Sequence, residues 1–458
     1  MAFADQPIEP LVLRGGTVVD AGTCGRLDVL LRVGRVAEVA TAISAPGVRV
    51  IDAAGCLVVP GGVDPHTHVL GAVAADTRSA LLGGTTTALV FVDGLPGERM
   101  AETVERVVAE ELGDAQIDVG LHGVLWDPDA YRDGDVAALA AAGAPSVKLW
   151  LAYRELGIQV DDATAYRVLR ECGRAGVLAL AHCENGDAIL ARRHELVDEG
   201  RIGLCEHALA RPVAFEAEAV HRFLTLAESA GATPYVVHVS GARPLAEIVA
   251  ARGRGQRVFG ECCPHHLLFH DDVYQTDAAV RFLMTPPLRT PADSRALWQG
   301  LASGSLDTYA SDHSHLTLAS KVAAGDDFTR VEYGLPGIGA RLPIALGLAV
   351  PRGLIAVVRA VEVACEAAAR IFGLAPSKGT LRPGADADVV VFDPAPRWSL
   401  GLASLADELD YTPYEGVQLQ GRVRDVFVGG EHAVRDGTLV GRAQSGRFLA
   451  RPAAARCA

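Results

Sequence analysis

The chain has 458 residues, half of them hydrophobic, which is enough for a large domain with a sizeable core and a smaller second module. Its formal net charge is −14 and it has no run of basic residues, so its composition disfavours nucleic acid and anionic membrane surfaces as partners. No apolar run is long enough to span a bilayer.

Both ends of the chain are predicted to be rich in β-strands. The N-terminal segments LVLRGGTVVD, LDVLLRVGRVAEVA and VRVIDAAGCLVVPGG alternate apolar and other residues or end in glycine pairs. The C-terminal segments GADADVVVFDP and RVRDVFVGGEHAVRDGTLVG have the same character. We therefore expect residues 1–58 and 376–458, the latter including a tail, to form one small β-sandwich domain.

Short apolar runs alternate with helical stretches between residues 59 and 375. The runs include TTTALVFV, SVKLWLAY, VLALAHCE, YVVHVS and RVFGECC, and typical helical stretches are MAETVERVVAEELG and ATAYRVLRECGRAG. Repetition of strand and helix over about 300 residues predicts a (β/α)8 TIM-type barrel, so the fold class is α/β. A doubly wound sheet is the alternative, but no G-x-G-x-x-G loop follows the first strand.

The cysteines and the first residues bear on the cellular compartment. There are nine cysteines, an odd number without regular spacing, which is typical of reduced thiols in a cytoplasmic protein. The opening residues MAFADQPIEP lack the basic and apolar regions of a signal peptide. We therefore expect a cytoplasmic protein.

Histidines and an aspartate end several of the apolar runs. In a barrel of this type, active-site side chains lie at the C-terminal ends of the strands. His66 and His68 are one residue apart, so their imidazoles face the same side of an extended chain. His182, His238 and Asp312 end three later runs. Imidazoles bind metal ions, and a carboxylate can bind a metal or accept a proton, so the set favours a hydrolytic metal site over isolated structural residues.

Lys148 is unusual because it lies within the apolar run SVKLWLAY. A free ammonium group is costly to bury. One interpretation is a lysine that reaches solvent from a strand edge. The other is a lysine whose positive charge is removed or inverted by a chemical modification.

Eleven motifs occur in an order that spans nearly the whole chain. They are GGVDPHTHV, SVKLWLAY, AHCENG, HVS, ECCPHHLLF, MTPPLR, SDHSH, PGIGARLP, KGTLRPGADADVVVFDP, DYTPYEG and SGRFLARP. This ordered set resembles the cyclic amidohydrolases of the amidohydrolase superfamily, and it is most similar to hydantoinases and dihydropyrimidinases.

The resemblance implies a binuclear metal site. In that family the strand lysine is carboxylated by carbon dioxide and bridges two divalent metals, which we expect to be zinc here. N6-carboxylation of Lys148 would turn a buried cation into an anion that the two metals neutralise. The implied ligands of the first metal are His66, His68, Lys148 and Asp312, and those of the second are Lys148, His182 and His238.

The resemblance also implies a reaction. A hydroxide that bridges the metals would attack the ring carbon of a small cyclic amide such as a hydantoin, a dihydropyrimidine or an imide. Asp312 would move the proton to the leaving nitrogen, and Tyr153 would donate to the oxyanion. By the same comparison, the main chain at Thr285 and Ala340 would bind the ring of the substrate.

Two positions bear on the choice of substrate. Dihydroorotases usually have an arginine where this chain has Leu70, so we expect an uncharged ring to be preferred over dihydroorotate. Arg289 and Arg341 are the candidates for a replacement cation. Trp150 beside Lys148 is a candidate to contact an apolar ring substituent.

Alternative functions are an allantoinase or a dihydroorotase-like enzyme, which could close a ring in biosynthesis. A non-catalytic scaffold related to dihydropyrimidinase is a further alternative, but such scaffolds lose metal ligands that this chain retains. Relatives are commonly tetramers or dimers, and we expect a homotetramer or homodimer here.

Overall fold

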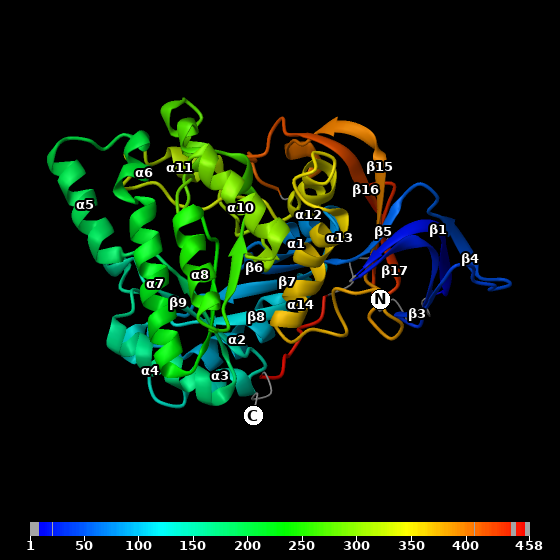
Figure 1. Ribbon diagram of the computed structural model, residues 1–458, viewed down its shortest axis with the longest axis horizontal. Helices are drawn as coiled ribbons and strands as arrows, with labels where there is room; N and C mark the ends of the chain where they lie inside the picture. The colour runs from blue at the N-terminus through cyan, green and yellow to red at the C-terminus, as the bar shows by residue number, and fades with distance from the viewer. Residues whose placement is uncertain (1–8, 21, 407, 441–445, 454–458) are drawn as a thin grey trace.

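The computed structural model describes residues 9–20, 22–406, 408–440 and 446–453. It consists of a helix-covered barrel and a second sheet that lies against one side of the barrel (Figure 1). Within the described residues, no helix combines the length and apolar character needed to cross a bilayer.

The described residues of the barrel form nine parallel strands in the order β13-β12-β11-β10-β9-β8-β7-β6-β14. The first and last of these belong to one segment, interrupted only by residues 310–312, and they pair with β12 and β6 respectively. The series therefore closes into a ring, which confirms the predicted barrel. The strands are β6 (Gly62–His68), β7 (Thr85–Val92), β8 (Asp118–Val124), β9 (Ser146–Trp150), β10 (Leu178–His182), β11 (Thr233–Val236), β12 (Phe259–Cys262), β13 (Thr308–Tyr309) and β14 (His313–Ser314).

Helices connect the strands and cover the outside of the barrel (Figure 1). The helix α4 illustrates the local signals, because the carboxylate of Asp161 accepts a hydrogen bond from the backbone of Thr164 and Gly176 ends the helix at φ 68°. The helices are α1 (Val73–Leu82), α2 (Met100–Glu110), α3 (Asp135–Ala141), α4 (Asp162–Ala175), α5 (Gly186–Asp198), α6 (His207–Ala210), α7 (Val213–Ala230), α8 (Ala242–Gly253), α9 (Pro264–Leu268), α10 (Pro291–Ser303), α11 (Leu318–Val322), α12 (Arg341–Ile344), α13 (Val357–Val361) and α14 (Ala367–Ile371).

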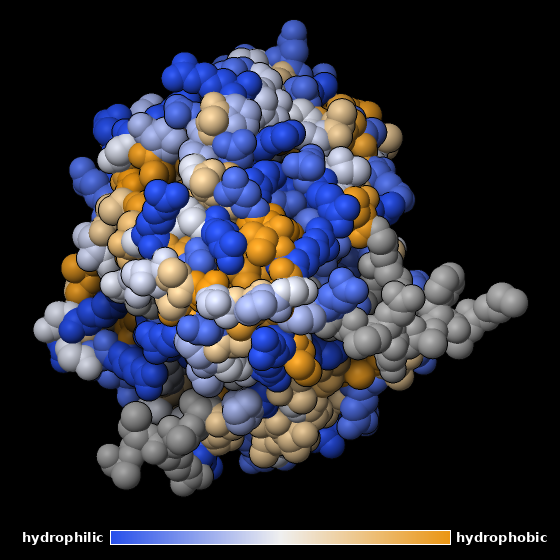
Figure 2. Space-filling model, turned by 90° about the vertical axis from the view of Figure 1, so that its right-hand side faces the viewer, coloured by the Kyte–Doolittle hydropathy of each residue, from blue (hydrophilic) through white to orange (hydrophobic). Residues whose placement is uncertain are grey.

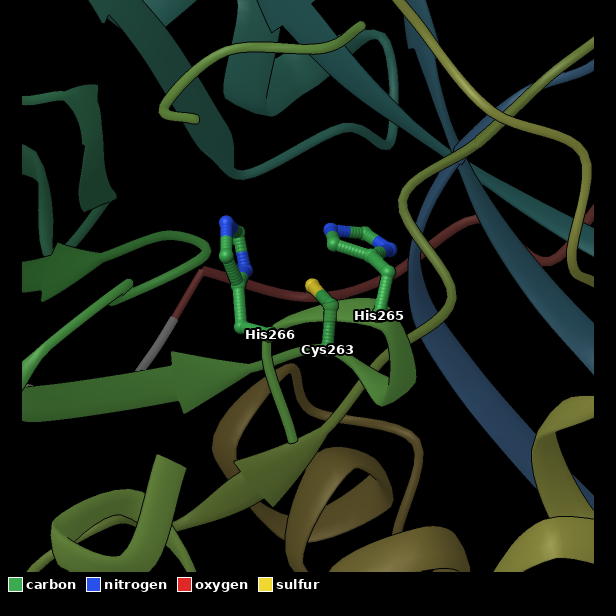
Figure 3. A group of neighbouring side chains, drawn as sticks. All are labelled: Cys263, His265 and His266. Carbon is green, nitrogen blue, oxygen red and sulfur yellow. The ribbon is translucent and has the colours of Figure 1, made fainter. Parts of the chain in front are cut away.

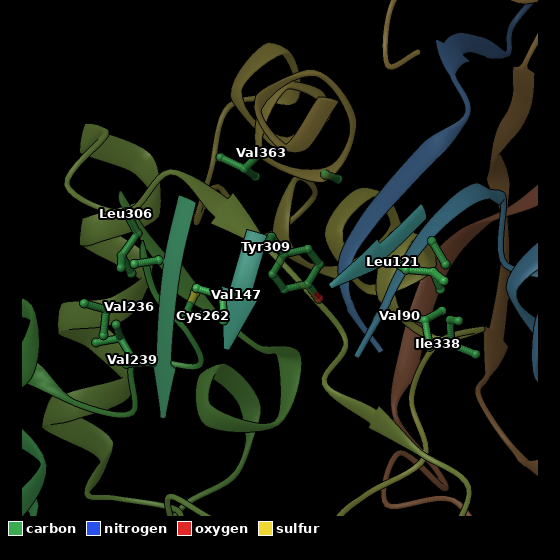
Figure 4. Close-up of a cluster of buried hydrophobic side chains, with 14 of the residues drawn as sticks. Val90, Leu121, Val147, Val236, Val239, Cys262, Leu306, Tyr309, Ile338 and Val363 are labelled. Carbon is green, nitrogen blue, oxygen red and sulfur yellow. The ribbon is translucent and has the colours of Figure 1, made fainter. Parts of the chain in front are cut away.

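Alternation along each barrel strand separates two sets of side chains. Val90 of β7 and Val147 of β9 belong to the large apolar cluster between strands and helices (Figure 4). Phe91 belongs to a different cluster, inside the barrel. Leu149 packs in the same outer cluster as Val147, so Lys148 between them points to the interior. Lys148 is fully buried, which excludes the interpretation that it reaches solvent.

Both ends of the chain build the second sheet, as predicted. Its order within the described residues is β18-β17-β16-β15-β5-β1-β2-β3, and β4 pairs with β1. Hydrophilic side chains cover much of this side of the molecule (Figure 2). The strands are β1 (Leu11–Asp20), β2 (Thr23–Arg32), β3 (Arg35–Ala40), β4 (Arg49–Asp52), β5 (Leu57–Pro60), β15 (Val389–Ser399), β16 (Gln418–Val428), β17 (Glu431–Arg435) and β18 (Thr438–Leu439).

A buried ion cluster ties the barrel to the second sheet. The Nζ atom of Lys378 lies 2.6 Å from a carboxylate oxygen of Asp118 on β8, 3.0 Å from one of Asp386 and 2.7 Å from one of Asp388. Arg447 lies 2.6 Å from Asp118, so the cluster also holds the C-terminal segment. Because these carboxylates are buried, Lys378 is the counter-ion that makes their burial tolerable.

We predict that Lys378→Met lowers the free energy of unfolding by about 3–5 kcal/mol, because it leaves the buried carboxylate of Asp388 without a cation among the described residues and removes one cation from Asp118 and Asp386. The control is Arg167→Met, which breaks a surface ion pair with Asp133 and should cost less than about 1 kcal/mol. Denaturant titration of both variants measures the difference. Equal losses in the two variants would contradict the role assigned to Lys378.

Candidate metal centre

Two histidines and an aspartate meet where the barrel closes. His66 and His68 end β6, and Asp312 lies in the interruption between β13 and β14. The Nε2 atoms of His66 and His68 lie 3.1 Å and 3.7 Å from Oδ1 of Asp312. Ligand atoms of the three residues lie within 4.8 Å of one another, as expected for side chains that share one cation.

Glu261 on β12 orients His66. Its Oε1 atom lies 2.7 Å from Nδ1 of His66 and also accepts a hydrogen bond of 3.1 Å from the backbone of His238. Although burial alone would lower it, the carboxylates of Asp312 and Glu261 raise the pKa of His66 to about 9. A carboxylate behind Nδ1 fixes the tautomer and aims Nε2 at the centre of the site, as in many metal centres.

His182 at the end of β10 and His238 just after β11 point toward each other. The Nδ1 atom of His182 lies 3.0 Å from Nε2 of His238, and Nε2 of His182 lies 2.8 Å from a carboxylate oxygen of Glu184. Burial lowers the pKa of both imidazoles, which keeps them neutral. Neutral imidazoles have the lone pair that a metal ligand needs. The carboxylate of Glu184 thus lies against one ring nitrogen of His182, as that of Glu261 does for His66, but it faces Nε2 instead of Nδ1.

Lys148 lies between these two groups of residues along the sheet. Its Nζ atom has no hydrogen-bond partner among the described residues. It lies 4.6 Å from the ring centroid of Phe91 and 5.0 Å from that of Trp150. Burial lowers the pKa of Lys148 to about 8, so the neutral amine is accessible near physiological pH. An unpaired buried amine is the feature that a carbamate bound by metals would resolve.

Three residues of the site have backbone conformations that are uncommon for side chains other than glycine. The φ angles are 73° at Tyr153, 37° at His238 and 48° at Asp312. Such conformations cost about 1–3 kcal/mol each and cluster at functional sites. At these positions the backbone therefore adopts a conformation that costs stability but places the side chains of the site.

A cavity of about 550 Å³ opens onto these residues. Of the residues predicted to bind substrate, Trp150 and Thr285 line it, and so does Tyr153, whose hydroxyl is hydrogen-bonded to that of Thr285. Leu70 and Ala340 are not among the described residues of the cavity wall. Leu70 packs against the main apolar cluster, and Ala340 is fully buried in another one.

Arg289 and Arg341, the candidates for a substrate-binding cation, are both held elsewhere. Arg289 donates to the Ser240 hydroxyl and to the carboxylate of Glu216. Arg341 is fully buried and donates to the backbone carbonyl group of Tyr309 at 2.7 Å. Neither is among the described residues of the cavity wall, so neither replaces the missing arginine.

The structure adds wall residues that the sequence analysis did not identify. Asp93 follows β7 directly, so the rule of strand ends could have found it. It lines the cavity, and desolvation of its carboxylate raises its pKa to about 6 although the nearby Lys148 opposes the shift. The cavity is also lined by Arg193 of α5 and by two loop residues, Tyr333 and Arg330. No local sequence pattern marks these three residues. The arginines show that the cavity is not free of cations.

The donor set fits two divalent metals. One side supplies two imidazoles and a carboxylate, the other supplies two imidazoles, and an unpaired lysine amine lies between. Imidazole and carboxylate are ligands of zinc and of other divalent first-row metals. Carboxylated Lys148 would complete both sets.

Comparison with known proteins agrees with this geometry. A model of the Amidohydrolase family matches residues 57–433. The D-hydantoinase of Ralstonia pickettii is 35% identical over 453 residues, which are 96% of this chain and 98% of that protein. The D-phenylhydantoinase of Escherichia coli O1:K1 / APEC is 36% identical over 454 residues, again 96% and 98%. The crystal structure of dihydropyrimidinase from Brevibacillus agri NCHU1002 has a TM-score of 0.93 at 32% identity, covering 98% of this chain and 100% of that one.

We predict that Glu261→Gln weakens metal binding by about 10- to 100-fold, because His66 loses the carboxylate that fixes its tautomer. The control is Glu247→Gln, which alters a surface pair with His221 and should leave metal binding unchanged. Equilibrium dialysis against a metal buffer gives both affinities. An unchanged affinity in the Glu261 variant would show that this carboxylate does not support the site.

Proposed function

The chain belongs to the amidohydrolase family, and we propose that it is a metal-dependent hydrolase that opens a cyclic amide of the hydantoin or dihydropyrimidine type. The observation that carries this proposal is the convergence of His66, His68, His182, His238 and Asp312 on one cavity at the C-terminal ends of the barrel strands, with Lys148 buried beside them. Their contacts fit metal binding, and the relatives of similar length are hydantoinases and a dihydropyrimidinase. The retained ligands argue against a scaffold without metals.

We assign the ligands as two sets that share Lys148. His66, His68 and Asp312 would hold one metal, and His182 and His238 the other. The neutral amine of Lys148 would add to carbon dioxide and release one proton to solvent, and the resulting carbamate would be shared by the two sets. When bound, the metals, which we propose to be zinc, lower the pKa of bound water and polarise the carbonyl of the substrate.

The protein's own residues move the protons. Asp312, whose pKa is held well below its usual range by His66 despite burial, is an anion that accepts a proton at a carboxylate oxygen. It then delivers this proton to the leaving ring nitrogen. Burial raises the pKa of Tyr153, so its hydroxyl stays protonated and can donate to the developing oxyanion.

The cavity wall supports a substrate with an uncharged ring and an apolar substituent. Trp126, Trp150, Ile158 and Met284 give it a largely apolar surface. Thr285 lies beside Tyr153 and can offer hydrogen-bonding groups to the ring amide. An apolar wall with a few polar groups near the reacting atoms is typical of small-molecule sites.

The remaining expectations about organisation stay proposals. We propose three segments: residues 1–58 and 376–458 for a small β-sandwich, and residues 59–375 for the catalytic barrel. The apolar cluster shared by strands from both chain ends, such as Leu13 and Val391, supports a common core in the terminal domain. A dimeric or tetrameric assembly and a cytoplasmic location are further predictions.

Lys148→Ala is expected to lose bound metal, from about two ions per chain to less than one, together with nearly all activity. Metal analysis and circular dichroism measure the loss and check that the fold survives. Formate or acetate should restore part of the activity by taking the place of the carbamate. Wild-type metal content in this variant would show that Lys148 does not bridge.

Asp312→Asn is expected to lower kcat by about two to four orders of magnitude, because the amide cannot accept the proton. KM should change less. Steady-state kinetics with hydantoin measure both constants. A kcat within about tenfold of the wild-type value would remove Asp312 from proton transfer.

For substrates, we predict that kcat/KM for hydantoin or dihydrouracil exceeds that for dihydroorotate by at least about tenfold, because Leu70 stands where dihydroorotases usually have the arginine that binds the substrate carboxylate. The variant Arg193→Gln tests whether a wall arginine changes this ratio. A preference of the wild type for dihydroorotate would contradict the uncharged-ring assignment.

A further inference from the structure

A second group of side chains that could hold a metal lies at the turn from β12 into α9, where Cys263 precedes the helix and His265 and His266 belong to its first turn. Cys263, His265 and His266 project from this turn toward one another (Figure 3). One ligand atom from each lies within 4.8 Å of the other two. All three side chains are buried, with at most 2% of each residue exposed. None of them is among the ligands assigned to the catalytic metals.

The ring nitrogens of this group are largely unpaired. Neither nitrogen of His265 has a hydrogen-bond partner among the described residues, and the same holds for Nδ1 of His266. The Nε2 atom of His266 lies 3.0 Å from the carbonyl oxygen of Pro286, so this nitrogen carries the proton. The lone pair of His266 is therefore on Nδ1, which is the arrangement seen in histidines that bind metals.

Leaving these groups buried and unpaired is unfavourable. A buried polar group without a hydrogen bond costs about 1–3 kcal/mol, and this turn has three such nitrogens in one place. Burial lowers the pKa of His265 to about 4, so the ring is neutral and has a free lone pair. A cation bound by these lone pairs would satisfy Nδ1 of His266 and one nitrogen of His265, while the other nitrogen of His265 would keep its proton.

We propose that Cys263, His265 and His266 form a third metal site, which takes a borderline or soft cation such as Zn²⁺, Co²⁺ or Cu⁺. One thiolate and two imidazoles are a ligand set for such ions. Binding would release the thiol proton of Cys263, since the thiolate is the ligand. Metal–ligand bonds of about 2.0–2.3 Å would draw together donor atoms that lie within 4.8 Å of one another.

A similar group elsewhere in the barrel shows why the lone pairs matter. Asp76, His313 and His315 also bring ligand atoms within 4.8 Å of one another. However, Nδ1 of His313 accepts a hydrogen bond of 3.0 Å from the backbone of Gly337, and its Nε2 lies 3.0 Å from Asp76. His315 directs Nδ1 to the same carboxylate at 2.7 Å. The Nδ1 lone pair of His313 is already engaged by Gly337, and the carboxylate of Asp76 lies at ion-pair distance from both histidines, so this group carries no metal proposal.

The position of the third site connects it to the catalytic centre. Cys263 is two residues from Glu261, which orients His66. The carbonyl that fixes His266 belongs to Pro286, the neighbour of Thr285 in the cavity wall. An ion at this turn would thus stabilise two segments that shape the catalytic site, without contacting substrate.

The test uses full-length protein produced in medium supplemented with cobalt. A thiolate bound to Co²⁺ gives a charge-transfer absorption band in the near ultraviolet, and the proposed catalytic ligands include no sulfur. The band therefore reports only on the third site, whether or not the catalytic assignment is correct. We expect the band in the wild type and its loss in Cys263→Ser.

The matched control is Cys262→Ser, because Cys262 is equally buried but packs in the outer apolar cluster. It should keep the band. Lys148→Ala should also keep it while losing catalytic metal. Absence of the band in the wild-type protein, or its persistence in Cys263→Ser, would overturn the proposal.

Discussion

The buried amine of Lys148 is the constraint on which the active site depends. The alternation of β9 directs this side chain into the barrel, where the rings of Phe91 and Trp150 are its neighbours and no described group accepts a hydrogen bond from it. Desolvation of an ammonium group is expensive, so the folded state favours the neutral amine. A neutral amine can react with carbon dioxide, and the resulting anion requires nearby cations. The imidazoles on both sides are suited to supply them by holding metals.

Barrel closure brings the other ligands to this amine. The backbone amide of Asp312 donates to the carbonyl of His66 at 3.0 Å, where the last strand meets the first. Asp64 accepts hydrogen bonds from the backbones of Ser311 and His66, and Arg341 lies beside it. Buried charges that are paired in this way are costly to break, so they hold the ligand-bearing segments in register. These paired charges at the base of the site thus stabilise the segments that carry the residues with strained backbone conformations.

Much of this architecture could be predicted from the sequence, because strand periodicity and strand-end position are local signals. They located the barrel, His66, His68 and Asp312, and the apolar surroundings of Lys148 marked it as unusual. Glu261 could have been found by the argument used for Lys148, because it is also a charged residue within an apolar run. The wall residues Arg193 and Arg330 could not, since loops and helix faces bring them together only in three dimensions. The main chain of Ala340 was inferred from the resemblance as a contact of the substrate ring, but Ala340 is not among the described residues of the cavity wall.

The central claim is that Lys148 exists as a carbamate. The most direct measurement is a ¹³C NMR spectrum of the metal-loaded protein prepared in ¹³C-labelled bicarbonate. We predict one carbamate signal in the wild type, and none in Lys148→Ala. A wild-type spectrum without this signal, from protein that contains its full complement of metal and is active, would contradict the account.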